Sequence, residues 1–371
     1  MSINPINASA IPCDILYRPT DPRYAESIRQ YQGCPTIAVT HGKRIFLGWY
    51  SGGITEPHID NYNLLIYSDD EGKTWSSPLL VIPSSRELGI HALDIQLWTD
   101  PRGFLHVYWV QNRACPKPDV LPEKQLPDQP LIVIDGWLFD DFAHNEWEIV
   151  CENPDDDNPV FSEPRRLDQG FLRCKPVVLA DGTWMNFNYD QMTTRYGYST
   201  STDEGKTFTR HYGAEKIGTY FDECMAYQKT DGTIRMMARC RDGQLAESRS
   251  YDNGATWTPA ELNGITAADT RFFLSRTPSG RVLLITNDDP KIRRNMTISL
   301  SDDDGATWKY RRCIDTRAGI SYPDADFRDG YIYMTYDRER TGAKEIFFLR
   351  FTEEDIMDES VPLVPQIVSK P

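Results

Sequence analysis

Short runs of apolar and aromatic residues recur along the chain, and each one follows a turn that ends in glycine. The runs are RIFLGWY, FLHVYWV, TWMNFNY, TIRMMAR, RVLLIT and YIYMTY, which follow Gly42, Gly103, Gly182, Gly232, Gly280 and Gly330. Further short segments of the same character, such as PTIAV and PVVLA, stand before these turns. Glycine tolerates the positive φ that a tight hairpin requires. The pattern therefore predicts six β-hairpins.

A second motif, S-x-D-x-G-x-T followed by Trp or Phe, recurs in phase with these hairpins. It occupies residues 68–75, 201–208, 250–257 and 301–308, and a degenerate copy lies at 161–164. The acidic residue and the glycine favour a tight turn, and the aromatic ring is suited to anchor that turn between sheets. We assign the acidic and aromatic residues of this motif to structure rather than to chemistry.

Repeats of about 40 to 50 residues with four strands each are typical of β-propeller blades. We therefore predict an all-β protein in which residues 1–371 form a single six-bladed β-propeller domain. The blades are expected near residues 30–80, 90–165, 171–212, 221–262, 268–312 and 318–352. The N-terminal segment 15–18 is expected to complete the last blade and close the ring.

The second predicted blade is longer than the others. Its excess lies in the stretch 115–146, which is rich in proline and aspartate. One interpretation is an inserted loop that overhangs the face where ligands bind. The alternative is a surface excursion with no structure of its own.

The overall composition narrows the classes of partner. A formal net charge of −15 argues against binding to nucleic acid or to an anionic membrane, since both require a basic surface. No apolar run reaches the roughly 18 to 20 residues that a membrane-spanning helix needs. The N-terminus MSINP lacks the basic start and apolar centre of a signal peptide, so we expect a cytoplasmic protein.

The cysteines and histidines give no sign of a metal site. The eight cysteines include no C-x-x-C pair, and the six histidines show no spacing typical of metal ligands. We therefore expect free thiols without disulfides, and neither a metal nor another cofactor.

In a propeller, the first strand of each blade lines the central channel, and ligands bind at one mouth. Polar and ionisable residues stand just before the first strands or just after the second strands of all six predicted blades. Those before first strands are Arg29, Gln32, Asp94, Arg173, Lys175, Asp222, Glu223, Arg271, Tyr322 and Asp324. Those after second strands are residues 56–60, Arg113, Asp190, Arg239, residues 287–294 and Arg338. A propeller without a ligand site would carry small or apolar residues at several of these places.

The S-x-D-x-G-x-T motifs, called boxes below, and the six predicted blades together resemble the sialidase (neuraminidase) superfamily over nearly the whole chain. The segment FDECMAYQKTDGTIRMMAR is similar to the sialidase segment with the catalytic glutamate and an arginine of the carboxylate-binding triad, which implies these roles for Glu223 and Arg239. RRNMTISLSDDDGATW resembles the stretch with the third triad arginine, which implies Arg294, with Arg293 as the alternative. ISYPDADFRDGYIYMTYDR resembles the segment with the tyrosine nucleophile, which implies Tyr322.

Chemistry explains why the resemblance groups these residue types. A neutral phenol can approach an anomeric carbon that bears a carboxylate without like-charge repulsion, while a neighbouring glutamate accepts its proton. Arginines bind the substrate carboxylate through bidentate hydrogen bonds. An acid must also protonate the leaving oxygen. The resemblance places it in GGITEPHIDNYN, where Glu56 and Asp60 are the candidates and His58 lies nearby.

The first blade departs from the sialidase pattern. Sialidases usually carry an arginine two residues before a proline there, but this chain reads QGCPTIAV and has Gly33 at that place. Either Arg29, the nearest arginine, reaches the site, or the first arm of the triad is missing. Further residues assigned as substrate contacts are Gln32, His58, Asp94, Lys175, Arg271 and Asp324.

The sequence thus predicts an exo-acting glycoside hydrolase that removes a terminal acidic sugar from an oligosaccharide or glycoconjugate. The departure in the first blade leaves room for a uronic acid or a deoxysugar in place of sialic acid. Two other functions stay open. One is a polysaccharide lyase or a non-sialic glycosidase on the same propeller, and the other is a propeller that binds glycans or proteins without catalysis.

Overall fold

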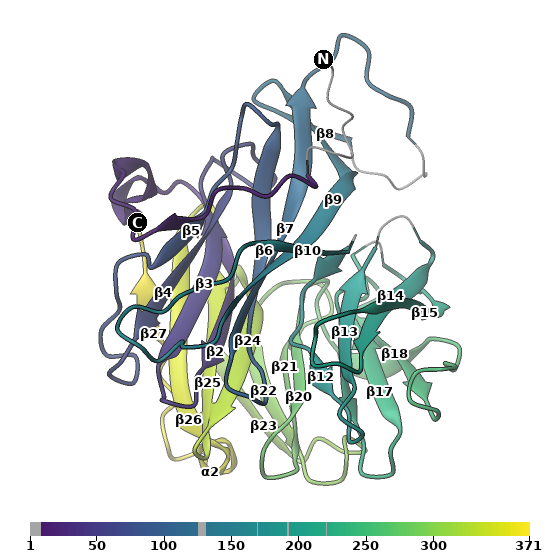
Figure 1. Ribbon diagram of the computed structural model, residues 1–371. Coiled ribbons are helices and arrows are strands. Elements are labelled where there is room, and N and C mark those ends of the chain that lie inside the picture. The colour runs from purple at the N-terminus through teal and green to yellow at the C-terminus, as the bar shows by residue number, and fades with distance from the viewer. Residues whose placement is uncertain (1–8, 125–130, 169, 191–192, 220) are drawn as a thin grey trace. The chain divides into compact units, whose positions relative to one another are not determined.

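The computed structural model describes residues 9–124, 131–168, 170–190, 193–219 and 221–371, and strands dominate it (Figure 1). Helical structure in this part is limited to η1 (Pro22–Tyr24), η2 (Glu26–Ile28) and α2 (Glu353–Met357). No helix among these residues has the length and apolar character needed to cross a membrane. Residue contacts group the chain into two compact units: the first holds residues 1–172, 340–345 and 369–371, and the second holds residues 173–339 and 346–368.

The first unit contains two antiparallel sheets. The first sheet comprises β1 (Leu16–Tyr17), β2 (Gln32–Val39), β3 (Ile45–Ser51), β4 (Tyr62–Ser68) and β5 (Leu80–Ile82), in the order β1-β5-β4-β3-β2. The second comprises β6 (Ile90–Thr99), β7 (Leu105–Pro116), β8 (Leu131–Ile134), β9 (Trp137–Cys151) and β10 (Arg165–Asp168), in the order β10-β9-β7-β6 with β8 paired to β9. Both sheets contribute to one buried core, which includes Phe46, Ile95, Trp109 and Trp147. The short strand β11 (Phe171–Leu172) ends this stretch of the unit.

The second unit contains strands of the remaining four sheets. The third sheet includes β12 (Val177–Val178), β13 (Trp184–Tyr189), β14 (Arg195–Ser201) and β15 (Thr209–Glu215). The fourth runs through β16 (Cys224–Gln228), β17 (Ile234–Ala238), β18 (Gln244–Ser250) and β19 (Glu261–Thr266). The fifth runs through β20 (Phe273–Arg276), β21 (Val282–Asn287), β22 (Met296–Ser301) and β23 (Tyr310–Asp315). The sixth runs through β24 (Ile320–Arg328), β25 (Tyr331–Arg338), β26 (Glu345–Thr352) and β27 (Gln366–Ser369).

Six antiparallel sheets in chain order confirm the predicted six-bladed β-propeller fold. The predicted glycines lie in the hairpins between the first two strands of their sheets, and all but Gly42 have a positive φ. In the first hairpin Lys43 takes the left-handed conformation instead, with φ of 76°. Gly42 allows the Asp155 side chain to lie close to the backbone, because a Cβ at this position would lie 2.4 Å from Cγ of Asp155. The Asp155 carboxylate accepts a hydrogen bond from the Gly42 amide at 2.9 Å.

The four boxes close turns between the last two strands of their sheets in chain order. In the first box, Ser68 Oγ donates to Asp70 Oδ1 at 2.8 Å, and Asp70 accepts from the amide and hydroxyl of Thr74 at 2.9 and 2.7 Å. The other boxes repeat these bonds around Asp203, Asp252 and Asp303. The threonine and serine hydrogen bonds lower the pKa of Asp70 to about 2. The boxes are therefore structural turns, as the sequence indicates.

The prediction for the N-terminal strand is wrong. β1 pairs antiparallel with β5, so it extends the first sheet rather than completing the sixth. The outer place of the sixth sheet belongs to β27, which comes from the C-terminal segment. Because β27 already pairs with the free edge of β26, the N-terminal segment has no edge to fill there. The single-domain organisation stays a prediction.

The long second blade also differs from expectation. The stretch 115–146, predicted as a loop, contains the end of β7, all of β8 and much of β9. The β7–β9 ladder continues out to Pro116 opposite Trp137, and β8 adds a further strand beside β9. Ile59, Ala114 and Phe139 form a small apolar cluster beneath it. Continued backbone pairing and this cluster explain why the insertion is a sheet extension; residues 125–130 lie outside the described part.

Candidate active site

Three inner strands carry the same irregularity, a bulge whose central residue has a positive φ. The ladders shift register between Gly33 and Thr36, between Leu93 and Gln96, and between Ser321 and Asp324. The residues in these bulges are Cys34, Asp94 and Tyr322, with φ of 54°, 55° and 54°. Such angles are uncommon for residues other than glycine, and bulges often re-aim a side chain beside an active site. Each strand thus presents one side chain out of the regular alternation.

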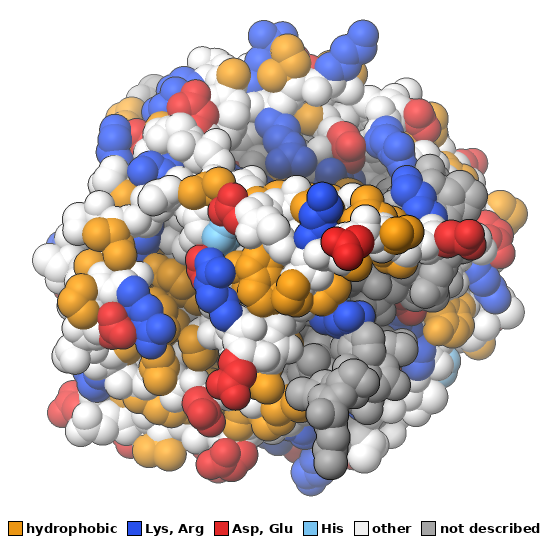
Figure 2. Space-filling view, turned by 90° about the horizontal axis from the view of Figure 1, so that it is seen from above, with side chains coloured by type: hydrophobic (Ala, Val, Ile, Leu, Met, Phe, Trp, Pro, Cys, Tyr) orange, Lys and Arg blue, Asp and Glu red, His pale blue; other side chains and the backbone are white. Residues whose placement is uncertain are grey.

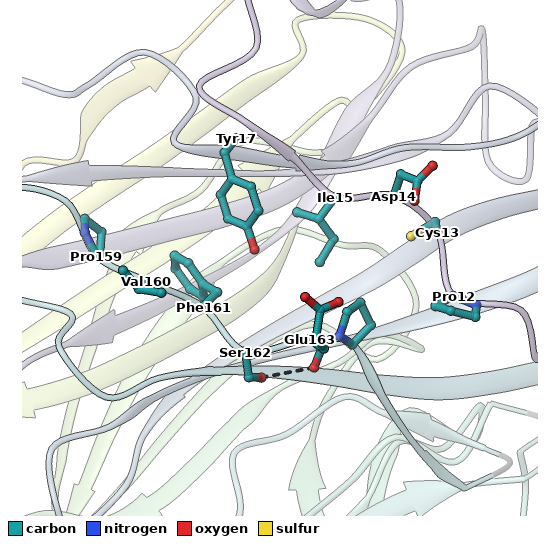
Figure 3. A pocket seen from close by; sticks show the side chains of 11 residues that line it. Pro12, Cys13, Asp14, Ile15, Tyr17, Pro159, Val160, Phe161, Ser162 and Glu163 are labelled. Atoms are coloured by element: carbon teal, nitrogen blue, oxygen red, sulfur yellow. Dashed lines mark hydrogen bonds between the residues drawn. The ribbon is translucent and has the colours of Figure 1, made fainter.

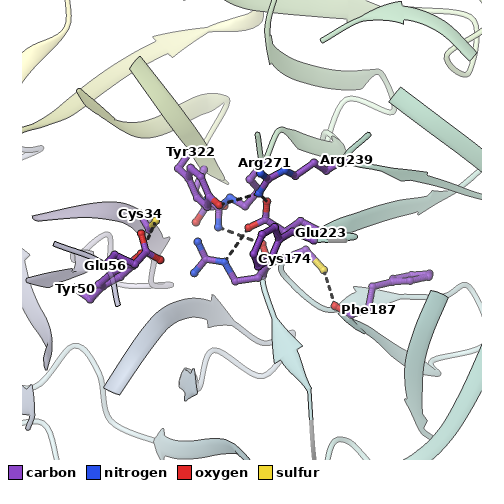
Figure 4. A network of polar contacts seen from close by, with 12 residues as sticks. Cys34, Tyr50, Glu56, Cys174, Phe187, Glu223, Arg239, Arg271 and Tyr322 are labelled. Carbon is purple, nitrogen blue, oxygen red and sulfur yellow. Dashed lines mark hydrogen bonds and ion pairs between the residues drawn. The ribbon is translucent and has the colours of Figure 1, made fainter. Parts of the chain in front are cut away.

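In the second unit, Tyr322 lies among arginine side chains (Figure 4). The guanidinium carbons of Arg173, Arg271 and Arg293 lie 5.0, 5.5 and 5.7 Å from the centre of its ring. A fourth arginine, Arg239, donates from Nη1 to the Tyr322 hydroxyl at 3.3 Å. Cations over an aromatic face are attracted to it, and positive charge near the hydroxyl favours the phenolate form. The predicted nucleophile therefore stands in a strongly positive setting.

Glu223 lies beside the same arginines and is buried. Its carboxylate accepts from Nη1 of Arg239 at 2.9 Å and from Nε of Arg173 at 3.3 Å. Burial alone would raise the pKa of this carboxyl, but the positive charges of Arg239, Arg173 and Arg271 outweigh burial and lower the pKa to about 2. Nη1 of Arg239 contacts both Glu223 and Tyr322, so the predicted pair meets at one guanidinium. The direct Tyr322–Glu223 hydrogen bond expected from the sequence stays a prediction.

Carboxylates and backbone carbonyls hold the arginines in place. Arg239 donates from Nε to Asp269 Oδ1 at 2.6 Å, and Arg293 donates to the Asp269 carbonyl at 3.0 Å. Arg271 is fully buried and donates to the carbonyls of Arg173 and Pro323 at 3.1 and 2.9 Å. Buried cations cost free energy unless they are paired and hydrogen-bonded. These contacts fix the guanidinium groups around the tyrosine.

Two further predicted contacts, Lys175 and Asp324, pair with each other. Lys175 Nζ lies 3.0 Å from Asp324 Oδ2, and Asp324 is fully buried. Arg271 Nη2 lies 4.0 Å from the other oxygen of Asp324. The pair borders the tyrosine cluster, because Asp324 ends the bulge that holds Tyr322 and lies near Arg271. Five basic side chains therefore face the three carboxylates of Glu223, Asp269 and Asp324 in this cluster.

Of the two candidates for the third triad arginine, only the alternative, Arg293, lies in the Tyr322 cluster, and the role of either residue stays a prediction. Arg294 turns to Asp289, with Nε 2.6 Å from Oδ2, and its side chain is 47% exposed. Arg293 instead lies over the ring of Tyr322. The two residues are adjacent at the end of the turn before β22, so their side chains leave the backbone in different directions, and Asp289 binds the outward one.

In the first unit, Glu56 is the centre of a second polar group (Figure 4). Its Oε2 accepts from the Tyr31 hydroxyl at 2.7 Å and from Arg340 Nη1 at 2.9 Å. Ligand atoms of Cys34, Glu56 and Asp94 all lie within 4.8 Å of one another, a spacing that a metal ion could bridge. The Arg340 guanidinium supplies positive charge to the same carboxylate. Glu56 is therefore a half-buried carboxylate held by one phenol and one arginine.

Asp60 and His58 occupy the same loop but make other contacts. Asp60 forms a bidentate pair with Arg86, with distances of 2.7 and 2.6 Å, and its side chain is 43% exposed. His58 Nε2 lies 2.9 Å from Asp135 Oδ2, at the tip between β8 and β9. His58 thereby ties the loop of Glu56 to the extended second blade. The sequence left Glu56 and Asp60 open as the acid; Asp60 is engaged by Arg86, and the choice between the two stays a prediction.

Arg29 and Gln32, predicted as substrate contacts, bind other residues of the first unit, and their part in substrate binding stays a prediction. Arg29 is buried, donates to the Tyr24 carbonyl at 3.2 Å and to Ser369 Oγ at 3.4 Å, and lies over the ring of Trp49. Gln32 is also buried, donates to Ser369 Oγ at 3.0 Å, and accepts from Trp49 Nε1 at 3.1 Å. Both side chains join the start of the first blade to the C-terminal segment, which explains why neither belongs to the Glu56 group.

Arg340 and Arg173 are the functional candidates that sequence reasoning left without a role. Arg340 follows the second strand of the sixth blade by two residues and contacts Glu56, which lies 284 positions earlier in the chain. Arg173 stands just before the first strand of its blade and was recognised only for that place. The sequence signal that could have identified both arginines is their position next to an inner or second strand, at the predicted mouth of the central channel.

Surface charge is mixed on one face of the molecule (Figure 2). On the face drawn in Figure 2, Lys and Arg side chains lie among Asp, Glu and hydrophobic side chains. The basic cluster around Tyr322 therefore contrasts with a chain whose formal net charge is −15. A local excess of arginine in an acidic protein is the arrangement expected for capture of a small anion.

Comparisons with known proteins identify the family to which the chain belongs. The model of the BNR repeat-like domain matches residues 143–334, and the model of the BNR/Asp-box repeat matches residues 66–77, at the first box. The chain belongs to the BNR repeat-like domain family. Within this family, the predicted resemblance to sialidases is confirmed: it is similar to the anhydrosialidase of Macrobdella decora, with 26% identity over 170 residues, covering 40% of this chain and 22% of that protein. The match thus spans only about a fifth of that relative.

Solved structures support the fold of this BNR propeller. The intramolecular trans-sialidase of Ruminococcus gnavus aligns with a TM-score of 0.68 and 15% identity, over 94% of this chain and 98% of that one. The NanB sialidase of Streptococcus pneumoniae aligns with a TM-score of 0.65 and 15% identity, over 91% and 70%. A protein of unknown function from Dyadobacter fermentans aligns with a TM-score of 0.64 and 16% identity, over 90% and 95%. At these identities the likeness is one of fold.

Proposed function

We propose that this BNR propeller is an exo-acting glycoside hydrolase that releases a terminal acidic sugar, with Tyr322 as its nucleophile. The observation that carries the proposal is the contact of one guanidinium, that of Arg239, with both the Tyr322 hydroxyl and the Glu223 carboxylate. Three more arginines lie over the tyrosine ring. A residue wedged between blades for packing would need neither a buried carboxylate nor four guanidinium groups.

Two half-reactions account for the residues. In the first, the Tyr322 oxygen attacks the anomeric carbon, Glu223 takes the phenol proton, and an acid protonates the departing glycosidic oxygen. In the second, water attacks the same carbon, the carboxylate of that acid takes a proton from the water, and the tyrosine oxygen leaves and recovers its proton from Glu223. Each proton is returned, and the glycosidic bond is hydrolysed.

The low pKa of Glu223 has a consequence for this sequence of steps. With a pKa of about 2, the carboxyl is ionised at neutral pH but is a weak base. A substrate carboxylate bound by the same arginines would offset part of their positive charge, and the burial that opposes ionisation would then count for more. Glu223 therefore becomes a better base when an anionic sugar is bound. The site would accordingly favour acidic over neutral substrates in turnover as well as in binding.

Glu56 is the proposed acid. Asp60 is bound in a bidentate pair to Arg86, whereas Glu56 is half-buried and accepts a hydrogen bond from the Tyr31 hydroxyl. Protonating a leaving oxygen requires a carboxyl that can carry a proton, and Arg340 beside it would hold the carboxylate form for the second half-reaction. We assign Arg173, Arg271 and Arg293 with Arg239 to the substrate carboxylate.

The test compares fluorogenic glycosides of sialic acid, glucuronic acid and galactose with the wild-type chain and three variants. We expect turnover of an acidic glycoside, and a loss of about 10³-fold or more in kcat for Tyr322→Phe and Glu223→Gln. Tyr333→Phe is the matched control, since Tyr333 is a buried tyrosine of the same blade outside the cluster. Near-wild-type activity in both site variants would rule out the mechanism.

A lyase on the same site is the second candidate, because a tyrosine base beside arginines that neutralise a uronate carboxylate suits elimination as well. An unsaturated, ultraviolet-absorbing product from a uronic acid polymer would identify it. A hydrolase instead releases a saturated sugar with a new reducing end.

A further inference from the structure

The first unit holds a cavity of about 490 Å³ that shares no lining residue with the Glu56 group (Figure 3). One wall is the N-terminal segment around Tyr17, and the other is the segment 159–164 that follows β9. A volume of this size lies within the range of pockets that hold small ligands. No role in the proposed hydrolysis falls to it.

An aromatic ring is available in this cavity. Tyr17 points toward Phe161 across it, with ring centroids 6.0 Å apart and planes at 31°, and Tyr17 is 49% exposed (Figure 3). Val160, on the same wall as Phe161, is 68% exposed. An exposed aromatic ring in a concave wall offers a flat apolar surface, and the hydrogen-bonding tip of a tyrosine stays available beside it. The C–H face of a sugar ring matches such a surface.

The polar groups of the cavity are acidic and neutral. Glu163 and Asp14 line it, and neither Lys nor Arg does. Burial, and then the negative charge of Glu163, raise the pKa of Tyr17, so its hydroxyl remains a hydrogen-bond donor. The two basic residues next to the lining in sequence make other contacts: Arg18 donates to the Asp157 carbonyl at 3.0 Å, and Arg165 donates to Glu148 Oε2 at 3.1 Å. Carboxylates accept hydrogen bonds from sugar hydroxyls but repel an acidic sugar.

We propose that this cavity is an accessory subsite for a neutral sugar residue of a glycan. The ring of Tyr17 would pack on one face of the sugar, and the Glu163 carboxylate would accept from its hydroxyls. The chemistry is opposite to that of the arginine cluster, since one site selects against the anion that the other selects for. A proline-rich peptide also fits aromatic-lined grooves, but it would leave the Glu163 carboxylate without donors.

Saturation-transfer NMR with the full chain tests the subsite in the absence of turnover. The probes are methyl β-galactoside, methyl α-mannoside and N-acetylglucosamine, with free sialic acid and a proline-rich peptide as comparisons. We expect at least one neutral sugar to bind, and its binding to survive Tyr322→Phe. Because binding is measured separately from catalysis, its failure would leave the proposed hydrolase untouched, and a failed hydrolase would leave the subsite untouched.

The variants distinguish the loss of the Tyr17 ring contact from a general effect on folding. Tyr17→Ala is expected to weaken binding of the neutral sugar by about tenfold, the scale of one lost aromatic contact, while Tyr17→Phe keeps most of it. Tyr251→Ala is the matched control, because Tyr251 is an exposed tyrosine of the second unit. If Tyr17→Ala does not fold, Glu163→Gln replaces it, with weaker sugar binding expected. The proposal would be overturned if the wild type bound no neutral sugar, if Tyr17→Ala or Glu163→Gln left sugar binding unchanged, or if only the peptide bound.

Discussion

Protonation of Glu223 should destabilise the protein at acidic pH, and a single substitution can isolate this contribution. The carboxyl pKa falls from its ordinary 4.5 to about 2 in the folded chain, because Arg239, Arg173 and Arg271 outweigh the effect of burial. A group whose pKa is lowered by folding adds stability above its unfolded pKa and loses it as the pH falls toward the folded one. The window is therefore about pH 4.5 to pH 2.

The magnitude follows from the shift. Each pKa unit corresponds to about 1.4 kcal/mol, so the ionised carboxylate contributes about 3 kcal/mol at pH 7. Less than half of this remains at pH 3, since the unfolded chain is by then protonated while the folded chain is not. In Glu223→Gln the group does not titrate. The difference in free energy of unfolding between wild type and Glu223→Gln should thus shrink by about 2 kcal/mol between pH 7 and pH 3.

Urea unfolding of both chains at pH 7, 5, 4 and 3 measures this difference. Other carboxylates with lowered pKa values, such as Asp70, titrate in both chains and cancel. Glu359→Gln serves as the control, because Glu359 is exposed, and its difference from wild type should stay nearly constant with pH. A constant difference for Glu223→Gln as well would show that the arginines do not hold this carboxyl in its ionised form.

Three further outcomes follow from the geometry. Arg293→Ala should raise KM for an acidic glycoside by about tenfold or more, whereas Arg294→Ala should leave it near the wild-type value, since only Arg293 lies over Tyr322. Glu56→Gln should lower kcat by about 10²-fold or more for a substrate with a poor leaving group and much less for an activated one, while Asp60→Asn should not discriminate between them. Titration of the denatured, unreduced protein should find eight thiols, because all eight cysteines are free; six or fewer would contradict the structure.

Local sequence was sufficient for the fold and for part of the site. The glycines and boxes act within a few residues of themselves, so their hairpins and turns are readable from the chain alone, and Glu223 and Tyr322 are found from the segments around them. Contacts between distant residues are not readable in this way. The pairing of Arg340 with Glu56 and the contact of Arg29 with Ser369 depend on how the last blade returns to the first.

The directions in which side chains point could not be predicted from the sequence either. Arg293 and Arg294 are chemically identical neighbours, and only the position of Asp289 decides which one turns away. The bulges at Cys34, Asp94 and Tyr322 are equally hidden, because none of the three residue types favours a positive φ as glycine does. The strand β27 lies beyond residue 352, where the last predicted blade ends, and prolines flank its short segment.

The first unit is built from segments that are far apart in the sequence, which affects how it can form during synthesis and how the chain can be truncated. The first unit combines residues 1–172 with residues 340–345 and 369–371, so part of it is synthesised only after residues 173–339 of the second unit. Two of those late residues matter: Arg340 holds Glu56, and Ser369 holds Gln32. A fragment cut after residue 172 would lack them, and Glu56 would lose its arginine partner while keeping its hydrogen bond from Tyr31. Removal of residues 369–371 should therefore disturb the first blade, where Ser369 contacts Arg29 and Gln32, as well as β27 itself.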